Sequence, residues 1–178
     1  MKSKKDVKEI IKILKETYPE AECSLDFSNP FQMAIAVLLS AQCTDARVNI
    51  VTKELFKIAP NAKEMNKLTV EEIEKYISSC GLYKTKAKNI KKLAEKVVKE
   101  YDGNIPDNMK ELMELPGIGR KSANVIMLEA FHNPQGVAID THAKRICNRI
   151  GISKEESPEK IEQDLLKKID KDEYFDAN

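Results

Sequence analysis

The chain has 178 residues, of which 42% are hydrophobic and 33% are charged, and its formal net charge is +1. These values are typical of a soluble globular protein of one or two compact units. No apolar run approaches the roughly 20 residues that a membrane-spanning helix needs, and no apolar signal segment follows Met1. We therefore expect a cytoplasmic protein without a membrane partner.

Nearly every segment has the apolar spacing of a helix, and no stretch alternates as a half-buried strand does. Residues 4–17 place their apolar side chains on one face, which predicts an amphipathic helix. Asn29 and Pro30 form a helix-start signal, and residues 31–39 are apolar almost all round. This second pattern is typical of a central helix that its neighbours bury.

The remaining boundaries come from capping residues. Thr44 or Asp45 can cap a helix that ends near residue 58, and Thr69 with Glu72 forms a capping box. We expect the latter helix to end at Gly81 in the left-handed conformation. Further helices are predicted at residues 84–101, 109–115, 120–131, 141–150 and 158–168, so the fold class is all-α.

Charged residues and cysteines limit the classes of function. Residues 81–151 carry 13 basic and 8 acidic side chains, whereas residues 152–178 carry 5 and 9. A local basic excess suits a phosphate backbone, although ordinary solvated helix faces would produce the same asymmetry. None of the four cysteines forms a C-x-x-C pair, so no metal site is predicted from their spacing.

The segment LPGIGRKS, residues 115–122, carries the most information. Its proline and two glycines form a tight turn, and helical spacing resumes directly after it. A turn that enters a helix N-terminus points backbone N–H groups outward, which suits a phosphate. A plain turn between two helices is the alternative interpretation.

Lys121 and Asp140 are the candidate catalytic residues. In the first turn of a helix, beside Arg120, the helix dipole and a second cation both disfavour the ammonium form of Lys121. Such an amine can attack electrophilic carbon and form a Schiff base; a phosphate-contacting lysine is the alternative. Asp140 is a predicted N-cap whose fixed carboxylate can stabilise positive charge on a sugar carbon. For His142 we favour packing or phosphate contact over general-base catalysis.

Taken together, six motifs resemble the endonuclease III family of the helix–hairpin–helix DNA glycosylase superfamily, and they extend over essentially the whole chain. The motifs are SNPF (28–31), LLSAQCTD (38–45), GLYKTKA (81–87), LPGIGRKSANV (115–125), AIDTH (138–142) and RICNR (145–149). The resemblance implies two helical lobes with the active site in the cleft between them. Residues 22–134 would form the central domain, and residues 1–21 with 135–178 the second.

The resemblance implies a monomeric, nucleoid-associated repair enzyme that binds damaged double-stranded DNA. Lys121 would attack C1′ of a flipped-out nucleotide, and the resulting Schiff base would lead to β-elimination, assisted by Asp140. The implied substrates are oxidised or ring-saturated pyrimidines and abasic sites. Relatives specific for adenine mismatches lack this lysine and only hydrolyse the glycosidic bond.

Other matched positions have implied roles in binding. Gln42 and Leu82 would fill the gap that the flipped nucleotide leaves, and Asp45 would line the base pocket. Gly117 and Gly119 would offer N–H groups to a phosphate. The predicted DNA contacts also include Arg120, His142 and Arg145.

The sequence departs from the family pattern at its end. Family members usually bind a 4Fe–4S cluster through four cysteines, spaced C-x₆-C-x₂-C-x₅-C, beyond the last helix predicted here. Residues 172–178 contain no cysteine, so we expect this chain to bind no cofactor and its second domain to be incomplete. Two alternatives therefore stay open: a non-catalytic DNA-binding fragment and a monofunctional mismatch glycosylase.

Overall fold

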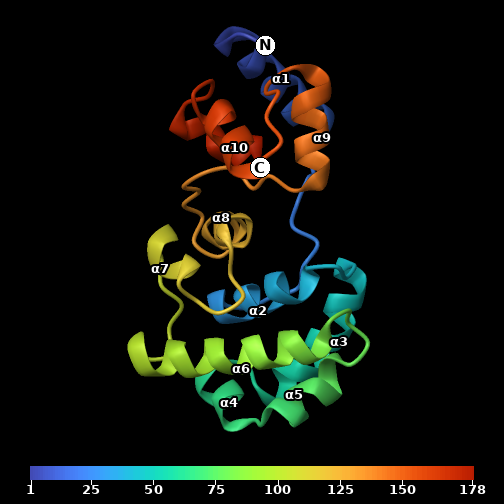
Figure 1. Cartoon of the computed structure of the whole chain (residues 1–178), viewed down its shortest axis with the longest axis vertical. Coiled ribbons are helices and arrows are strands. Elements are labelled where there is room, and N and C mark those ends of the chain that lie inside the picture. Colours follow the sequence, from blue (N-terminus) through green and yellow to red (C-terminus); the bar gives the residue numbers. More distant parts are fainter. The chain divides into compact units, whose positions relative to one another are not determined.

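The computed structural model describes all of residues 1–178, and its regular elements are all helices (Figure 1). The chain divides into two compact units. Unit 1 comprises residues 1–22 and 132–178, and unit 2 comprises residues 23–131. The all-α prediction is confirmed, and no helix has the length and apolar character that crossing a membrane requires.

Unit 2 is built around one buried helix. Helix α2 packs against α3, α6 and α8, while α6 packs along α4 and α5 (Figure 1). Helix α7 packs against α8. The helices of this unit are α2 (Pro30–Ser40), α3 (Asp45–Ile58), α4 (Ala62–Lys67), α5 (Val70–Ile77), α6 (Tyr83–Glu100), α7 (Met109–Met113) and α8 (Arg120–Glu129).

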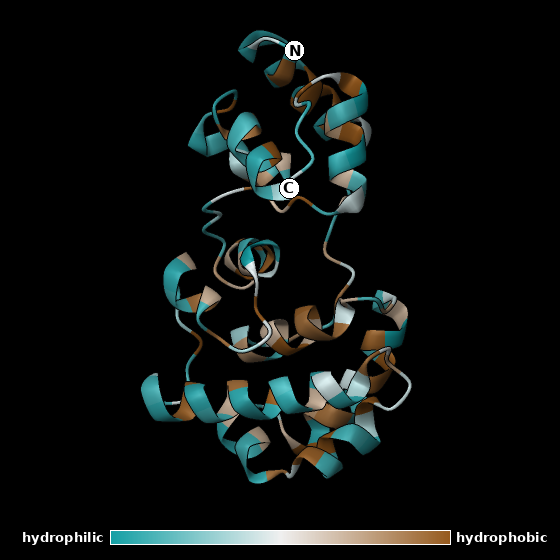
Figure 2. Cartoon of the chain, in the orientation of Figure 1, coloured by the Kyte–Doolittle hydropathy of each residue, from teal (hydrophilic) through white to brown (hydrophobic).

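Helix α2 is buried on all sides, as its sequence predicts. Every residue from Phe31 to Leu39 is buried, and hydrophobic residues dominate the helix (Figure 2). The one polar member, Gln32, accepts a hydrogen bond from Ser28 N and donates from its Nε2 to the Pro60 carbonyl at 3.2 Å. Its amide is thus satisfied inside the core, where an unpaired polar group would be costly.

Most predicted helix starts in unit 2 are confirmed. The Thr44 hydroxyl caps α3, and Thr69 forms the expected capping box with Glu72 at the start of α5. Two details are wrong. Helix α5 ends at Ile77, and the left-handed residue near its end is Leu82 rather than Gly81. The short helix α4, which Asn61 caps, was not predicted.

Unit 1 has a separate, smaller core. Helix α9 packs against α10, and α1 packs against the final helix, α11. The elements are α1 (Lys4–Thr17), α9 (Thr141–Ile150), α10 (Pro158–Leu166), a 3₁₀ turn η1 (Lys171–Glu173) and α11 (Tyr174–Ala177). The last two are too short for helical periodicity to reveal them. The core side chains are Val7, Ile11, Val137, Ile139, Cys147, Ile152, Ile161, Leu165 and Ile169.

Ion pairs connect α1 to the C-terminal turn of the same unit. Lys4 Nζ lies 2.7 Å from an Asp170 carboxylate oxygen, and Lys8 pairs with both Asp170 and Glu173. Hydrogen bonds from the two lysines lower the pKa of Asp170 to about 2. Lys15 and Asp176 form a further pair at 2.9 Å. These contacts join segments that are more than 160 positions apart in the sequence.

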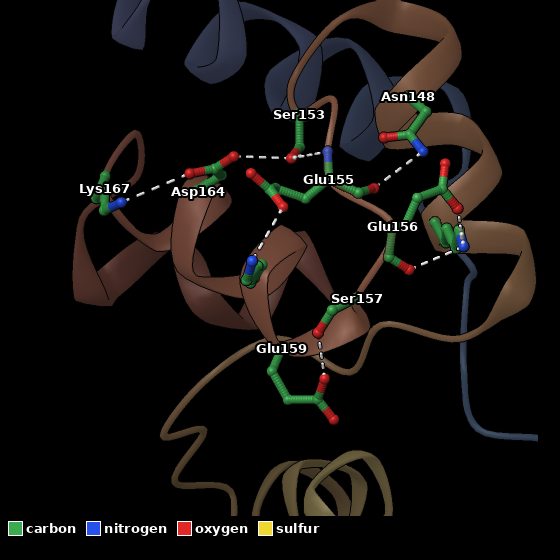
Figure 3. Close-up of polar contacts among 10 residues, drawn as sticks. Asn148, Ser153, Glu155, Glu156, Ser157, Glu159, Asp164 and Lys167 are labelled. Atoms are coloured by element: carbon green, nitrogen blue, oxygen red, sulfur yellow. Dashed lines mark hydrogen bonds and ion pairs between the residues drawn. The ribbon is translucent and has the colours of Figure 1, made fainter.

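The loop between α9 and α10 is held by its own polar contacts (Figure 3). Ser153 Oγ donates to Asp164 at 2.7 Å and accepts from the Glu155 backbone N–H at 3.1 Å. Asn148 on α9 donates its Nδ2 to the Glu155 carbonyl at 3.3 Å. The Ser153 hydrogen bond lowers the pKa of Asp164. The loop therefore fixes the C-terminal half of α9 to α10.

We expect Asp170→Asn to lower the thermal unfolding midpoint at neutral pH. The pKa of Asp170 is lowered from 3.8 to about 2, so its ion pairs stabilise the folded state above pH 3.8 and are lost as the pH falls toward 2. The difference between variant and wild type should therefore shrink over that pH range. Asparagine keeps the N-cap function of the position. Asp172→Asn, at an exposed neighbouring carboxylate, is the control and should show no such pH-dependent difference.

Candidate functional site

Buried apolar side chains hold the turn between α7 and α8 against the core of unit 2. Leu115 and Ile118 are buried, and the Ile118 N–H donates to the Leu115 carbonyl at 3.1 Å. Gly117 has a φ of +82°, and a Cβ at this position would come within 2.8 Å of Leu38 Cδ1. The left-handed backbone angle therefore favours glycine here, and any side chain would also have to displace the end of Leu38 on α2.

Helix α8 begins at this turn without a capping side chain, because its N-cap residue is Gly119. Its first intrahelical hydrogen bond runs from the Ala123 N–H to the Gly119 carbonyl at 2.9 Å. A serine or aspartate at the cap would occupy an N–H group of the first turn. A glycine leaves this positive helix end open to an external anion.

Lys121 is the second residue of α8, and its side chain is exposed. Arg120 precedes it, so two cationic side chains lie beside the positive helix end. Further along α8, Ala123, Ile126 and Met127 are fully buried, which fixes the helix to the core of unit 2. The lysine is therefore an exposed amine on a helix whose opposite face is packed in the core.

Gln42 and Leu82 both have left-handed backbone conformations and exposed side chains. Their φ angles are +53° and +57°, and Leu82 is 60% exposed. Non-glycine residues seldom adopt such angles. An exposed leucine side chain also lacks the stabilisation that burial would provide. Their two loops meet, since a Cβ on Gly81 would lie 3.0 Å from the Gln42 carbonyl oxygen. The structure thus brings together two residues that are 40 positions apart.

Asp45, the first residue of α3, is held by neighbours that sequence analysis missed. The Ser24 hydroxyl donates to its carboxylate. Asn49, one turn along α3, donates to the Ser24 carbonyl at 2.8 Å and accepts from the Asp26 N–H at 3.0 Å. Ser24 lies in a segment without regular structure, so periodicity gave no signal for this contact.

Asp140, His142 and Arg145 belong to unit 1 rather than unit 2. Asp140 is the N-cap of α9, as predicted, and accepts from the Ala143 N–H at 2.7 Å. Arg145 Nη2 lies 3.4 Å from His142 Nδ1. Both face a pocket of about 400 Å³ that is lined by Thr141, His142, Lys144, Arg145, Asn148 and Arg149.

Two basic residues of this pocket were not predicted. Lys144 pairs with Glu156 at 2.6 Å, which lowers the pKa of that carboxyl and offsets part of the charge. Arg149 is exposed on the same helix. Positions 145 and 149 are one helical turn apart, a spacing that could have identified both arginines as members of one face.

The side chains present do not fit an iron–sulfur cluster. No three His, Cys, Asp or Glu residues form a group that could hold a metal ion. Cys147 lies in unit 1, whereas the other three cysteines lie in unit 2. Burial raises the pKa of Cys23 and Cys147, and burial with a hydrogen bond to Cys43 raises that of Cys80 to about 11. Cluster ligands are thiolates, and these surroundings favour neutral thiols.

Comparison with known proteins identifies the class to which this fold and these motifs belong. Residues 35–171 match the model of the HhH-GPD superfamily of base excision DNA repair proteins. The chain belongs to that superfamily and is a DNA glycosylase. Its named relatives are endonuclease III proteins. That of Synechocystis sp. is 48% identical over 170 residues, which are 95% of this chain and 78% of the relative. The endonuclease III of Bacillus subtilis is 44% identical over 160 residues, which are 89% of this chain and 73% of the relative.

The fold matches an endonuclease III structure over almost the entire chain. The structure of a trapped endonuclease III–DNA covalent intermediate superposes with a TM-score of 0.93 at 41% sequence identity. The match covers 98% of this chain and 82% of that one. The helix–hairpin–helix glycosylase fold expected from the sequence is therefore confirmed.

The two hairpin glycines should differ in their tolerance of alanine. Gly117→Ala forces a left-handed angle and a clash with Leu38, so we expect a loss of about 1–3 kcal/mol in the free energy of unfolding. Gly119→Ala is the matched control, because its Cβ would meet nothing within 4 Å and its φ is −95°. Alanine is a poorer N-cap than glycine but restricts the unfolded chain more, so the opposing effects should leave a loss of about 0.5 kcal/mol, below that of Gly117→Ala, in denaturant titrations. Equal losses in both variants would contradict this assignment.

Proposed function

We propose that the chain is a bifunctional enzyme that removes damaged bases from DNA and then cuts the strand at the abasic site. The observation that carries this proposal is Lys121, an exposed amine in the first turn of a helix whose N-cap is a glycine. This arrangement supplies a nucleophile next to a binding site for an anion. A covalent DNA intermediate is named for the structurally similar endonuclease III, which supports the proposal.

DNA binding is proposed to use both units. In unit 2, the N–H groups of the turn at Gly117 and Gly119, with Arg120, would bind a backbone phosphate. In unit 1, His142 and Arg145 would contribute further phosphate contacts from α9. These contacts carry no base information, so they would position the duplex without selecting its sequence.

The target base must leave the helical stack before Lys121 can reach its sugar. Gln42 and Leu82 are proposed to fill the resulting gap, the amide by hydrogen bonding to the orphan base and the leucine by stacking. Their exposure leaves both side chains accessible to DNA, and their left-handed backbones, which cost stability in the unbound protein, further support this role. Asp45 is proposed to line the pocket for the flipped base, with its carboxylate fixed by Ser24.

The reaction would begin with attack of the neutral Lys121 amine on C1′. A nitrogen–carbon bond forms and the glycosidic bond breaks, so the base leaves with the bonding electrons and takes up a proton. The sugar ring then opens to a protonated Schiff base, which acidifies the proton on C2′. Loss of that proton expels the 3′ phosphate oxygen by β-elimination, which cuts the strand. The Asp140 carboxylate is proposed to assist lysine deprotonation and to stabilise the cationic sugar.

Oxidised or ring-saturated pyrimidines and abasic sites are the proposed substrates. We expect borohydride to trap wild-type protein covalently on duplex DNA that contains an abasic site, because reduction converts the Schiff base to a stable amine. Lys121→Gln should form no adduct and leave the strand intact. Lys99→Gln, at an exposed lysine near the end of α6, is the charge-matched control and should trap normally. An undiminished adduct with Lys121→Gln would refute the assignment of the nucleophile.

The same substrates separate the two alternatives. A monofunctional mismatch glycosylase would release a base and leave an abasic site that is cut only after alkali treatment. A non-catalytic DNA-binding module would bind DNA with strong salt dependence and cut neither substrate. A nick at an abasic site that depends on Lys121 contradicts both.

Asp140→Asn should separate the charge of this residue from its structural role. Asparagine also caps helices well, so the Ala143 N–H keeps its acceptor and stability should change little. Loss of the negative charge should slow base removal roughly a hundredfold or more in single-turnover assays on duplex DNA containing thymine glycol. A rate near that of wild type would show that Asp140 acts only as a cap.

A further inference from the structure

Lys86 is the most deeply buried cation of the chain, with 5% of its surface exposed, and its surroundings are unusual. Its ammonium group donates to the Leu39 carbonyl at 2.9 Å and to the Ala41 carbonyl at 2.6 Å. Both acceptors lie at the C-terminal end of α2, where unpaired carbonyls and the helix dipole favour a cation. Carbonyl oxygens at the end of α2, rather than a carboxylate, stabilise the positive charge of this ammonium group.

This contact lies between the two residues that are proposed to enter the DNA gap. Gln42 directly follows Ala41, and Leu82 precedes Lys86 by one helical turn, with the Lys86 N–H donating to the Leu82 carbonyl at 3.0 Å. The Lys86 side chain therefore joins the first turn of α6 to the end of α2. Leu82 directly precedes α6, and Gln42 follows the end of α2. Neither insertion residue takes part in the side-chain contact.

Two further observations place the same pair of loops close together. Gly81 approaches the Gln42 carbonyl so closely that an added Cβ would lie 3.0 Å from the oxygen. Cys43 directly follows Gln42 and Cys80 directly precedes Gly81, and Cys43 lies close enough to Cys80 to raise the pKa of its thiol. The two loops are thus close neighbours, and the buried ammonium supplies charge-assisted hydrogen bonds that join them.

We infer that Lys86 is a positioning residue that sets the spacing of Gln42 and Leu82, so that both can enter the gap opened by base extrusion. The inference rests on the proposed function. Holding two left-handed residues in place requires surrounding structure that determines them, and a buried cation bound to two carbonyls provides it. A displacement of about 1 Å at such a site can cost up to a hundredfold in rate.

The test compares duplex and single-stranded DNA that carry the same abasic site. Only the duplex has an orphan base and a gap to fill, so only its cleavage should depend on the spacing of the two loops. Lys86→Met keeps the length of the side chain and removes the ammonium. We expect it to slow nicking of the duplex roughly ten- to a hundredfold and to leave nicking of the single strand within about twofold of wild type.

Two companion variants complete the experiment. Lys92→Met, at an exposed position of the same helix, is the control and should behave as wild type on both substrates. Gly81→Val separates the loops sterically without removing a charge, and it should reproduce the selective loss on duplex DNA. If Lys86→Met fails to fold, as judged by thermal unfolding, Lys86→Gln takes its place, because it keeps a hydrogen-bond donor but removes the charge, and the same selective loss on duplex DNA is expected.

A second readout follows the orphan base directly. With 2-aminopurine opposite the abasic site, wild type should change the fluorescence on binding, and Lys86→Met should diminish that change. Equal losses on both substrates, or full duplex activity in a folded Lys86→Met, would overturn the inference. If the proposed function itself is wrong, the wild-type protein will nick neither substrate. That outcome differs from a variant that still nicks single-stranded DNA but has lost activity on the duplex.

Discussion

The constraint on which unit 2 depends is that helix α2 has no polar face. With Phe31 to Leu39 all buried, the helix must be enclosed, and α3, α6 and α8 enclose it. Every candidate site element of unit 2 contacts this helix or continues from its end. The hairpin glycine Gly117 lies against Leu38, Gln42 follows its last turn, and the α6 residue Lys86 binds its terminal carbonyls. Burial of one apolar helix thus supports the candidate nucleophile, the candidate anion site and the candidate insertion loop within unit 2.

Helix termini supply much of the chemistry of the candidate site, and they are used in three ways. The N-terminus of α8 has a glycine cap, so it can receive an external phosphate. The N-terminus of α9 is capped by Asp140, whose carboxylate is held in place by a backbone N–H. The C-terminus of α2 is satisfied by the buried ammonium of Lys86. Each terminus has backbone groups without intrahelical partners, and a different partner gives each a different function.

The two candidate insertion loops, which contain Gln42 and Leu82, have features that reduce the stability of the folded protein. Left-handed angles at Gln42 and Leu82 and the exposure of the leucine each cost free energy in the unbound protein. The hydrogen bonds of the buried Lys86 ammonium to the Leu39 and Ala41 carbonyls offset part of that cost. In unit 1 the polar contacts have a different purpose: the ion pairs of Asp170 join the first helix to the last turn and stabilise a small core.

Most helices and the candidate site residues could be predicted from local sequence patterns. Capping boxes, N-caps and apolar periodicity act over three to seven residues, so the helix at residues 4–17 and the caps at Thr69 and Asp140 could be predicted locally. The LPGIGRKS motif likewise indicated a phosphate turn and an amine from adjacent residues. Only the tertiary structure placed the left-handed angle on Leu82 instead of Gly81, buried Lys86 and bound Ser24 to Asp45. These features depend on partners 21 to 47 positions away, and no local pattern specifies which of many polar groups will meet there.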